Sequence, residues 1–292
     1  MADHSPWKKR ILHGSGYLLV ALTAYLIALW QLLPYAEVGR RVEADLRAQG
    51  IGVEIQGLGP GSFLGCSAST VNLFNPELPD LRWQLTNVDL RLLPQRLLTG
   101  ERAAGLRAVT LGGVLETTAL WQNPPLLDAR WRDLQLSRLT LPTPIQELPV
   151  VGQTSGSLRT TIDPSNPSRA DGTLEAQLQG VRIGAGKVQG IPVPEVQLGD
   201  GTLSVRVADG KVEVAAAEFK NGDLEISFTG SVLLREDLPR SLVNGILTLR
   251  PSEQAAKDLA LAFALFPGAK GSDGRYTARV RGSLGAPKLL KR

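Results

Sequence analysis

Apolar residues alternate one for one with polar or small residues over most of the chain after position 50. A period of two is the pattern of a β-strand that has one buried and one exposed face. The pattern therefore predicts a mostly β chain made of amphipathic strands. The clearest runs are residues 51–55, 81–85, 88–92, 174–178, 203–207, 212–214, 224–228 and 276–280.

The breaks in this alternation indicate how the strands connect. The apolar phase slips by one residue between 81–85 and 88–92, which predicts a β-bulge near Asn87. Asp-Gly and Asn-Gly pairs tolerate the positive φ angles of tight hairpins, so they favour antiparallel neighbours. Five such pairs are predicted turns: Asp171-Gly172, Asp200-Gly201, Asp209-Gly210, Asn221-Gly222 and Asp273-Gly274.

A different pattern precedes the strands, because Tyr17 to Leu33 contains no charged residue. A helix over residues 11–34 is long enough to cross a bilayer at about 1.5 Å per residue. A cation cluster before it favours a cytoplasmic N-terminus, and aromatic rings near both ends are typical of the two interfaces. The anchor residues that we predict are Lys8, Lys9, Arg10, Tyr17, Trp30 and Tyr35. A cleaved signal peptide and a buried core helix are the alternatives.

These two patterns divide the chain into four parts. Residues 1–10 form a cytoplasmic tail, 11–34 the transmembrane helix, 35–50 an amphipathic juxtamembrane helix, and 51–292 a β-rich domain outside the cytoplasm. In a bacterium this means anchorage in the inner membrane with most of the chain in the periplasm. The proline-rich intervals 141–151 and 190–195 are possible boundaries, but the strand pattern is the same on both sides of each.

Two further helices are predicted within the β-rich part. Residues 93–98 are long enough for one helical turn. Residues 252–266 read as a helix that Ser252 caps and that Pro267-Gly268 ends. Its apolar residues form a stripe, which predicts that this helix covers part of the sheet.

Charge and chemistry narrow the function classes. The net charge is +4, of which the tail before the apolar run carries half, so the rest of the chain offers no concentrated basic face for nucleic acid. The only histidines are His4 and His13, so the β-rich part has neither a histidine-based nucleophile system nor a metal-ligand spacing. Cys66 is the single cysteine, and it is expected to be a small buried residue rather than half of a disulfide. We therefore expect no enzyme activity, no cofactor and no metal.

Several segments are similar to known envelope proteins. The basic start, the apolar helix, LLPYAEVGRRVEADLRAQGIGVEI, LGPGSFLG and the short strands resemble protein N of the type II secretion system, especially the longer form of delta-proteobacteria. GSLRTTIDPSNPSRADGTLEAQLQGVRI and the closing segment resemble AsmA-like envelope proteins. The closing motif consists of Gly274, Tyr276, Gly282, Leu284 and Pro287. The resemblance implies an elongated, curved antiparallel sheet behind one membrane helix.

The resemblance also implies two functions. The first is a non-enzymatic, inner-membrane component of the type II (general) secretion pathway that supports protein export by contacting other envelope subunits. The second is an AsmA-like lipid-binding or lipid-transfer protein with an apolar groove. Residues that would line such a groove, or else form an ordinary core, are Trp83, Leu90 and Phe228. The expected partners are the inner membrane, other secretion or envelope proteins and phospholipid.

Overall fold

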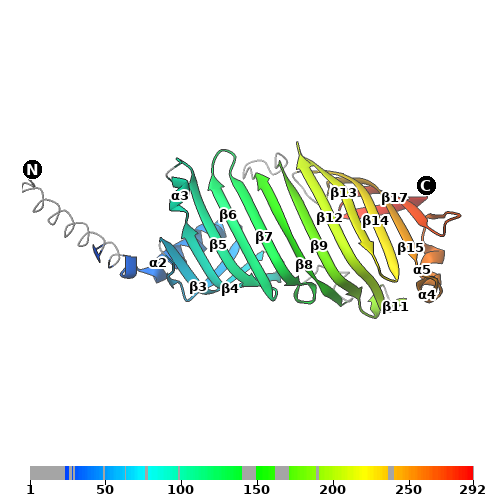
Figure 1. The fold of residues 1–292 in the computed structure, drawn as a ribbon, viewed down its shortest axis with the longest axis horizontal. Helices are drawn as coiled ribbons and strands as arrows, with labels where there is room; N and C mark the ends of the chain where they lie inside the picture. Colours follow the sequence, from blue (N-terminus) through cyan, green and yellow to red (C-terminus); the bar gives the residue numbers. More distant parts are fainter. Residues whose placement is uncertain are drawn as a thin grey trace, which may run out of the picture.

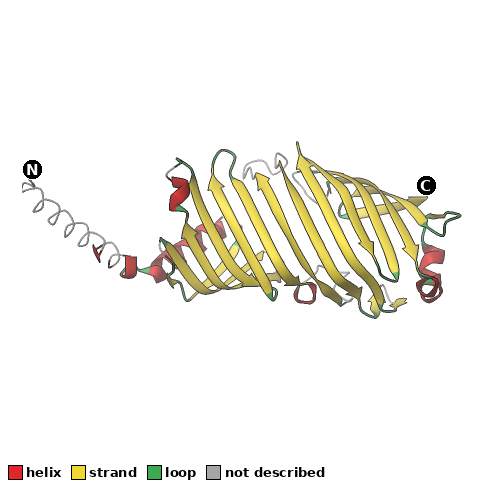
Figure 2. Ribbon diagram, in the orientation of Figure 1, coloured by secondary structure: helices red, strands yellow, loops and turns green. Residues whose placement is uncertain are grey.

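The computed structural model describes residues 24, 25, 28, 30–48, 50–62, 64–75, 78–97, 99–139, 149–161, 171–188, 191–235 and 240–291. Within these residues the molecule is one long β-sheet with a small two-stranded ribbon, and most of its helices lie near the two ends of the sheet (Figures 1 and 2). Sixteen strands belong to this sheet, and every paired neighbour in it is antiparallel. The prediction of a mostly β, antiparallel fold is confirmed.

The strands follow one another in almost strict sequence order, as β1-β3-β4-β5-β6-β7-β8-β9-β12-β13-β14-β15-β17-β16, with β2 beside β3 and β18 beside β17. A separate two-stranded ribbon, β10-β11, interrupts the order. The sheet strands are β1 (Gly52–Gln56), β2 (Gly59–Pro60), β3 (Gly65–Asn75), β4 (Leu78–Leu92), β5 (Arg102–Thr110), β6 (Gly113–Trp121), β7 (Leu126–Gln135), β8 (Val150–Thr161), β9 (Asp171–Ile183), β12 (Val196–Ala208), β13 (Lys211–Lys220), β14 (Leu224–Leu233), β15 (Leu242–Pro251), β16 (Ala269–Lys270), β17 (Tyr276–Ser283) and β18 (Ala286–Lys291). The ribbon strands are β10 (Gly186–Val188) and β11 (Ile191–Val193).

The helices lie at the ends of the sheet, except for the 3₁₀ helix between β7 and β8. They are α2 (Tyr35–Ala48), α3 (Pro94–Leu97), the 3₁₀ helix η1 (Leu136–Arg138), α4 (Glu253–Asp258) and α5 (Ala260–Leu265). The helix α2 ends at Ala48, and the φ of 83° at Gly50 lets the Ile51 amide donate to the carbonyl of Leu46 at 3.0 Å. The Glu43 side chain accepts a hydrogen bond from the Ile55 amide at 2.6 Å, so α2 covers the free edge of β1.

The predicted helix 252–266 is present but broken into α4 and α5. The Ser252 hydroxyl caps α4 by accepting from the Ala255 amide at 3.2 Å. At Leu259 the backbone leaves helical geometry, with φ −103° and ψ 17°. Leu259 packs on the buried cluster of Val181, Val196 and Leu198, so the helix pair covers the sheet only at this end.

The predicted bulge at Asn87 is confirmed. Asn87 has a φ of 50°, and the β4–β5 register shifts between Thr86 and Asp89. The extra residue turns Leu85 to the same face of the sheet as Val88, and both are buried in one apolar cluster. This explains why the apolar phase slips within β4.

Three of the five predicted turns lie between strands, but two were wrong. Asp209-Gly210, Asn221-Gly222 and Asp273-Gly274 separate strands as expected. Asp171-Gly172 instead opens β9, and Asp200-Gly201 lies within β12. Their aspartates bond to neighbouring backbone: Asp171 Oδ1 accepts from the Asp209 amide and Asp200 Oδ1 from the Gly180 amide, each at 3.1 Å.

Most of the predicted anchor, including Lys8, Lys9, Arg10 and Tyr17, lies outside the described residues. Among the residues that are described, no helix combines the length and the apolar character that a membrane crossing requires.

Candidate functional site

The sheet has one apolar face that continues across most of its strands. Cross-strand partners stand on the same side of a sheet, so the register defines rows that run perpendicular to the strands. One row passes through thirteen strands, from β3 to β18, without a charged residue. It consists of Cys66, Leu90, Leu106, Thr117, Ala129, Leu158, Leu174, Val205, Val214, Gly230, Gly245, Val280 and Leu289.

A parallel row on the same face is free of charge from β5 to β17, and its next register partner, on β18, is Lys291. It consists of Ala108, Leu115, Trp131, Gly156, Ala176, Leu203, Ala217, Phe228, Leu247 and Ala278. Together these rows form the surface that we call the apolar trough. At about 4.8 Å between strands, thirteen strands extend over roughly 55 to 60 Å.

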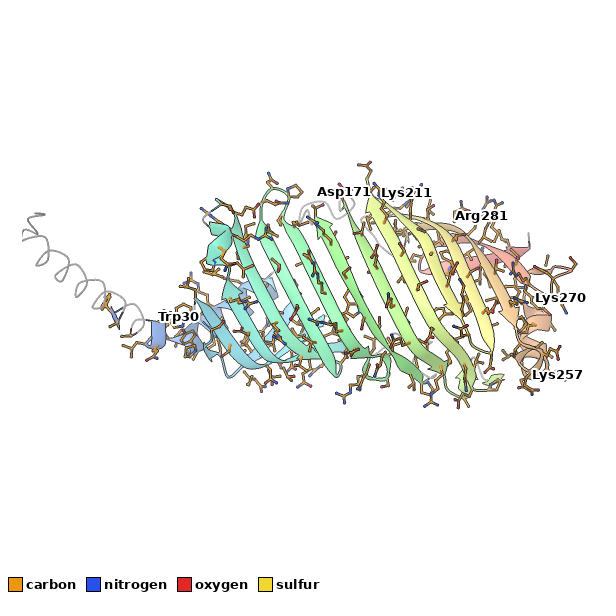
Figure 3. All side chains as sticks on the ribbon, viewed as in Figure 1. Trp30, Asp171, Lys211, Lys257, Lys270 and Arg281 are labelled. Carbon is orange, nitrogen blue, oxygen red and sulfur yellow. The ribbon has the colours of Figure 1, made fainter. Side chains whose placement is uncertain are left out.

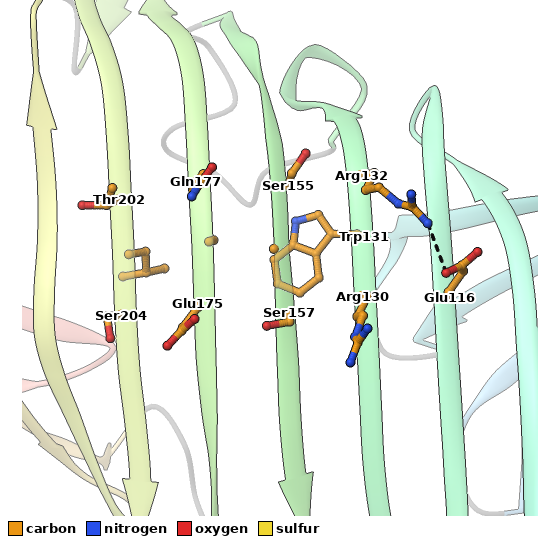
Figure 4. A pocket seen from close by; sticks show the side chains of 13 residues that line it. Glu116, Arg130, Trp131, Arg132, Ser155, Ser157, Glu175, Gln177, Thr202 and Ser204 are labelled. Atoms are coloured by element: carbon orange, nitrogen blue, oxygen red, sulfur yellow. Dashed lines mark hydrogen bonds and ion pairs between the residues drawn. The ribbon is translucent and has the colours of Figure 1, made fainter.

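The opposite face is polar and charged. Arg107, Glu116, Arg130, Ser157 and Glu175 follow one another across β5 to β9. Figure 4 shows a shallow depression of about 660 Å³ on this face, with the polar side chains in front of the strands and the Trp131 ring behind them. Arg132 and Glu116 form an ion pair there at 3.3 Å.

The polar depression is lined mainly by charged, hydroxyl and amide side chains. Its charged groups are exposed, and solvated ion pairs of this kind contribute little. Within the described ranges no cluster of three or more His, Cys, Asp or Glu residues could hold a metal ion.

The apolar trough lies on the inner side of the bent sheet. In Figure 1 the first and the last strands pass behind the central strands, on the side to which Trp131 points in Figure 4. Side chains project from both faces along the whole sheet (Figure 3). No second sheet covers the inner face among the described strands, and apart from η1, which packs beside β8, the helices lie near the ends. Amphipathic sheets normally cover their apolar side, so this open face is the candidate functional site.

Three aromatic rings of the apolar face pack closely against glycines of neighbouring strands. A Cβ atom at Gly156 would lie 2.6 Å from the Trp131 ring, and one at Gly201 would lie 2.8 Å from the Phe219 ring. Likewise, a Cβ atom at Gly245 would meet the Phe228 ring at 2.5 Å. Each ring therefore lies against a glycine of the next strand instead of projecting into the open space.

The trough deepens near α2 into a pocket of about 400 Å³, which we call the chamber. Its lining carries no charged residue and comes from β3 to β6 and from the segment before α2. The lining residues are Trp30, Leu64, Gly65, Cys66, Leu90, Leu92, Ala104, Leu106, Thr117, Ala119 and Trp121. Three of them are unusually exposed for large apolar side chains: Leu90 at 40%, Leu92 at 45% and Trp121 at 57%.

The structure brings some of the predicted site residues together. The Trp30 and Tyr35 rings pack edge to face at 6.2 Å, and the Tyr35 hydroxyl donates to the Trp30 carbonyl at 2.8 Å. Leu90 lines the chamber beside Trp30. Trp83 and Phe228 also lie on the apolar face, and Trp83 is 49% exposed, but neither lines the chamber.

Sequence reasoning missed Trp121 and Trp131. Each ends a run with period two, at 115–121 and at 127–131, so the alternation could have placed both on the apolar face. Cys66, expected to be small and buried, lies half-buried in the chamber wall. Burial, and then the Asp89 carboxylate, raise the pKa of the Cys66 thiol.

Comparisons of the chain with protein-family models, with curated proteins and with solved structures found no match. The geometry of the trough and the chamber is therefore what bears on function.

Proposed function

We propose that this chain is a non-enzymatic envelope protein that binds lipid acyl chains along the apolar trough. The observation that carries the proposal is a row of thirteen uncharged positions on a face that no second layer of the described residues covers. Exposing apolar surface to water costs about 25 cal/mol per Å². A contiguous exposed apolar patch of more than a few hundred Å² usually marks a binding site. An acyl chain is long, apolar and flexible, so it fits a trough of this shape.

Crosslinking in vesicles tests this function. The full chain is reconstituted into phosphatidylglycerol vesicles that contain a lipid with a diazirine in its acyl chain, and labelled peptides are mapped after illumination. We expect labels on residues of the apolar face, such as Leu174 and Leu203, and none on their neighbours Thr173 and Thr202. Labels confined to residues 11–34 would contradict the proposal.

A role in protein export, which the resemblance to protein N of the type II secretion system implies, is the second candidate. The feature that favours it is β18, which pairs with β17 on one side and has no further strand partner among the described residues. Leu289 and Leu290 are 40% and 43% exposed there. An open edge is a surface to which an extended segment of another subunit can pair. Pull-down of defined secretion subunits that depends on β18 would support this function.

Anchorage in the bacterial inner membrane, with the sheet in the periplasm, is part of the same proposal. Its support is the uncharged run from Tyr17 to Leu33 and the cations Lys8, Lys9 and Arg10. A reporter fused after Arg292 is expected to be active only outside the cytoplasm, and replacing the three cations by Gln is expected to weaken this preference. Cytoplasmic activity of the unaltered fusion would contradict the orientation.

A further inference from the structure

We infer that the chamber binds one acyl chain of a phospholipid and that Arg102, at its rim, binds the phosphate of the headgroup. This inference rests on the proposed function. It assigns one end of the trough as the place where both the acyl chain and the headgroup of one phospholipid are bound. It follows from the shape of the chamber, from the position of Arg102 and from the exposure of the surrounding apolar residues.

The chamber has the size and chemistry of a site for one chain. Its volume of about 400 Å³ is within the range of small-molecule pockets, roughly 300 to 1,000 Å³. None of its lining residues is charged, and Thr117 contributes the only side-chain hydroxyl among them. Each methylene group that moves from water into such a site gains about 0.8 kcal/mol. A phosphate headgroup finds no charged partner among these residues, so its place is outside the chamber.

Arg102 supplies the partner at the rim. It is the first residue of β5 and stands opposite Trp121, two residues before Ala104 of the chamber lining. The alternation of β5 therefore places Arg102 on the apolar face, about 7 Å along the strand from Ala104. Its neighbour Glu101 pairs with Arg96 at 2.9 Å, and among the described residues no carboxylate pairs with Arg102.

A guanidinium group beside an exposed indole suits a phosphate at the end of an apolar site. Arginine donates two parallel hydrogen bonds to phosphate oxygens, and these charge-assisted bonds are stronger than neutral ones. Trp121, 57% exposed, presents an amphipathic ring at the same rim. From β5 to β17 the two rows carry no charged residue, so Arg102 is a cation next to an apolar surface.

The test compares two photoactivatable lipids with the same diazirine acyl chain. One is phosphatidylglycerol and the other is diacylglycerol, which lacks the phosphate. The full chain is reconstituted into vesicles that contain either lipid, and crosslinks to peptides of β3 to β6 are quantified. Arg102→Gln is expected to lower crosslinking of phosphatidylglycerol in the chamber about tenfold and to leave that of diacylglycerol within about twofold.

Arg107→Gln is the matched control, because Arg107 lies on the same strand but on the polar face. It is expected to change neither signal. Equal crosslinking of phosphatidylglycerol by Arg102→Gln and the unaltered protein would overturn the headgroup assignment. Crosslinks along the trough but not in β3 to β6 would contradict acyl-chain binding in the chamber, and the proposed function would be retained. The absence of any crosslink on the apolar face would refute the proposed function itself.

Discussion

At the scale of single residues, the apolar face is shaped by aromatic rings that lie on glycines. Trp131, Phe219 and Phe228 each contact a glycine of the adjacent strand, at Gly156, Gly201 and Gly245. Glycine weakens a strand interior, so its presence there usually marks a close approach. Here the approaching group is a ring that fills the space above the glycine.

Replacing Gly201 by Ala tests this packing. The new Cβ atom would lie 2.8 Å from the Phe219 ring, so the ring or the strand must shift. We expect the free energy of unfolding to fall by about 1 to 3 kcal/mol, measured by thermal unfolding of the full chain in detergent. Gly59→Ala is the control, since no atom lies within 4 Å of its Cβ position, and its effect should stay within about 0.5 kcal/mol.

A second pair of variants shows whether the ring is the cause. In a Phe219→Ala background the ring is gone and the nearest atom given for a Cβ at Gly201 is the Glu218 carbonyl oxygen at 3.1 Å, so Gly201→Ala should lose most of its effect. An undiminished effect in that background would mean that the backbone, and not the ring, requires glycine at this position.

The chamber thiol gives a prediction on pH. The thiolate is the reactive form of cysteine, and burial together with Asp89 raises the pKa of Cys66. The rate of alkylation by a small uncharged maleimide should therefore rise with pH along a curve displaced upward from that of a free cysteine. Asp89→Asn removes the repulsive charge and should move the curve toward lower pH. Asp128→Asn should leave it in place, and a curve at or below that of a free cysteine would contradict the assignment.

At the scale of elements, the sequence predicts most strands, because each needs only a local alternation. The bulge at Asn87 was predictable for the same reason, since it shifts the phase within one strand. Asp200-Gly201 could not be separated from a true hairpin such as Asp209-Gly210, because the difference lies in the partner strands. Position 201 needs glycine on account of Phe219, which is eighteen residues later in the chain.

The first edge of the sheet carries an element-scale prediction. Glu43 of α2 accepts a hydrogen bond from the Ile55 amide, which would otherwise be an open donor on β1. Glu43→Ala should lower the free energy of unfolding by about 1 to 2 kcal/mol and speed hydrogen exchange at the Ile55 amide. Glu43→Gln keeps an acceptor oxygen and should retain most of the protection. Unchanged exchange in Glu43→Ala would show that α2 does not close this edge.

At the scale of the whole molecule, the apolar trough exists only because many strands are in register. Each strand has one apolar side, which the sequence shows, but the rows require every neighbour to match. The matching passes through bulges, such as those between β7 and β8 and between β8 and β9, whose extra residues the sequence does not reveal. The open inner face, the chamber and the position of Arg102 at its rim were for this reason beyond prediction from the sequence.

Continuity of the trough is itself testable. Leu174 stands in the thirteen-strand row near its centre, so Leu174→Glu places a carboxylate in the path of any chain that extends along it. A charge in apolar surroundings is unfavourable by several kcal/mol unless it is paired, so crosslinks to β12 and later strands should fall about tenfold. Crosslinks in the chamber should persist, since the chamber lies on the other side of position 174.

Two further variants serve as controls for this prediction. Thr173→Glu, one residue away on the polar face, should change neither the chamber crosslinks nor the distal ones, and Leu158→Glu on the adjacent strand should lower the distal crosslinks as Leu174→Glu does. Full labelling of the distal strands in both blocked variants would mean that lipids reach them directly from solution rather than along the trough.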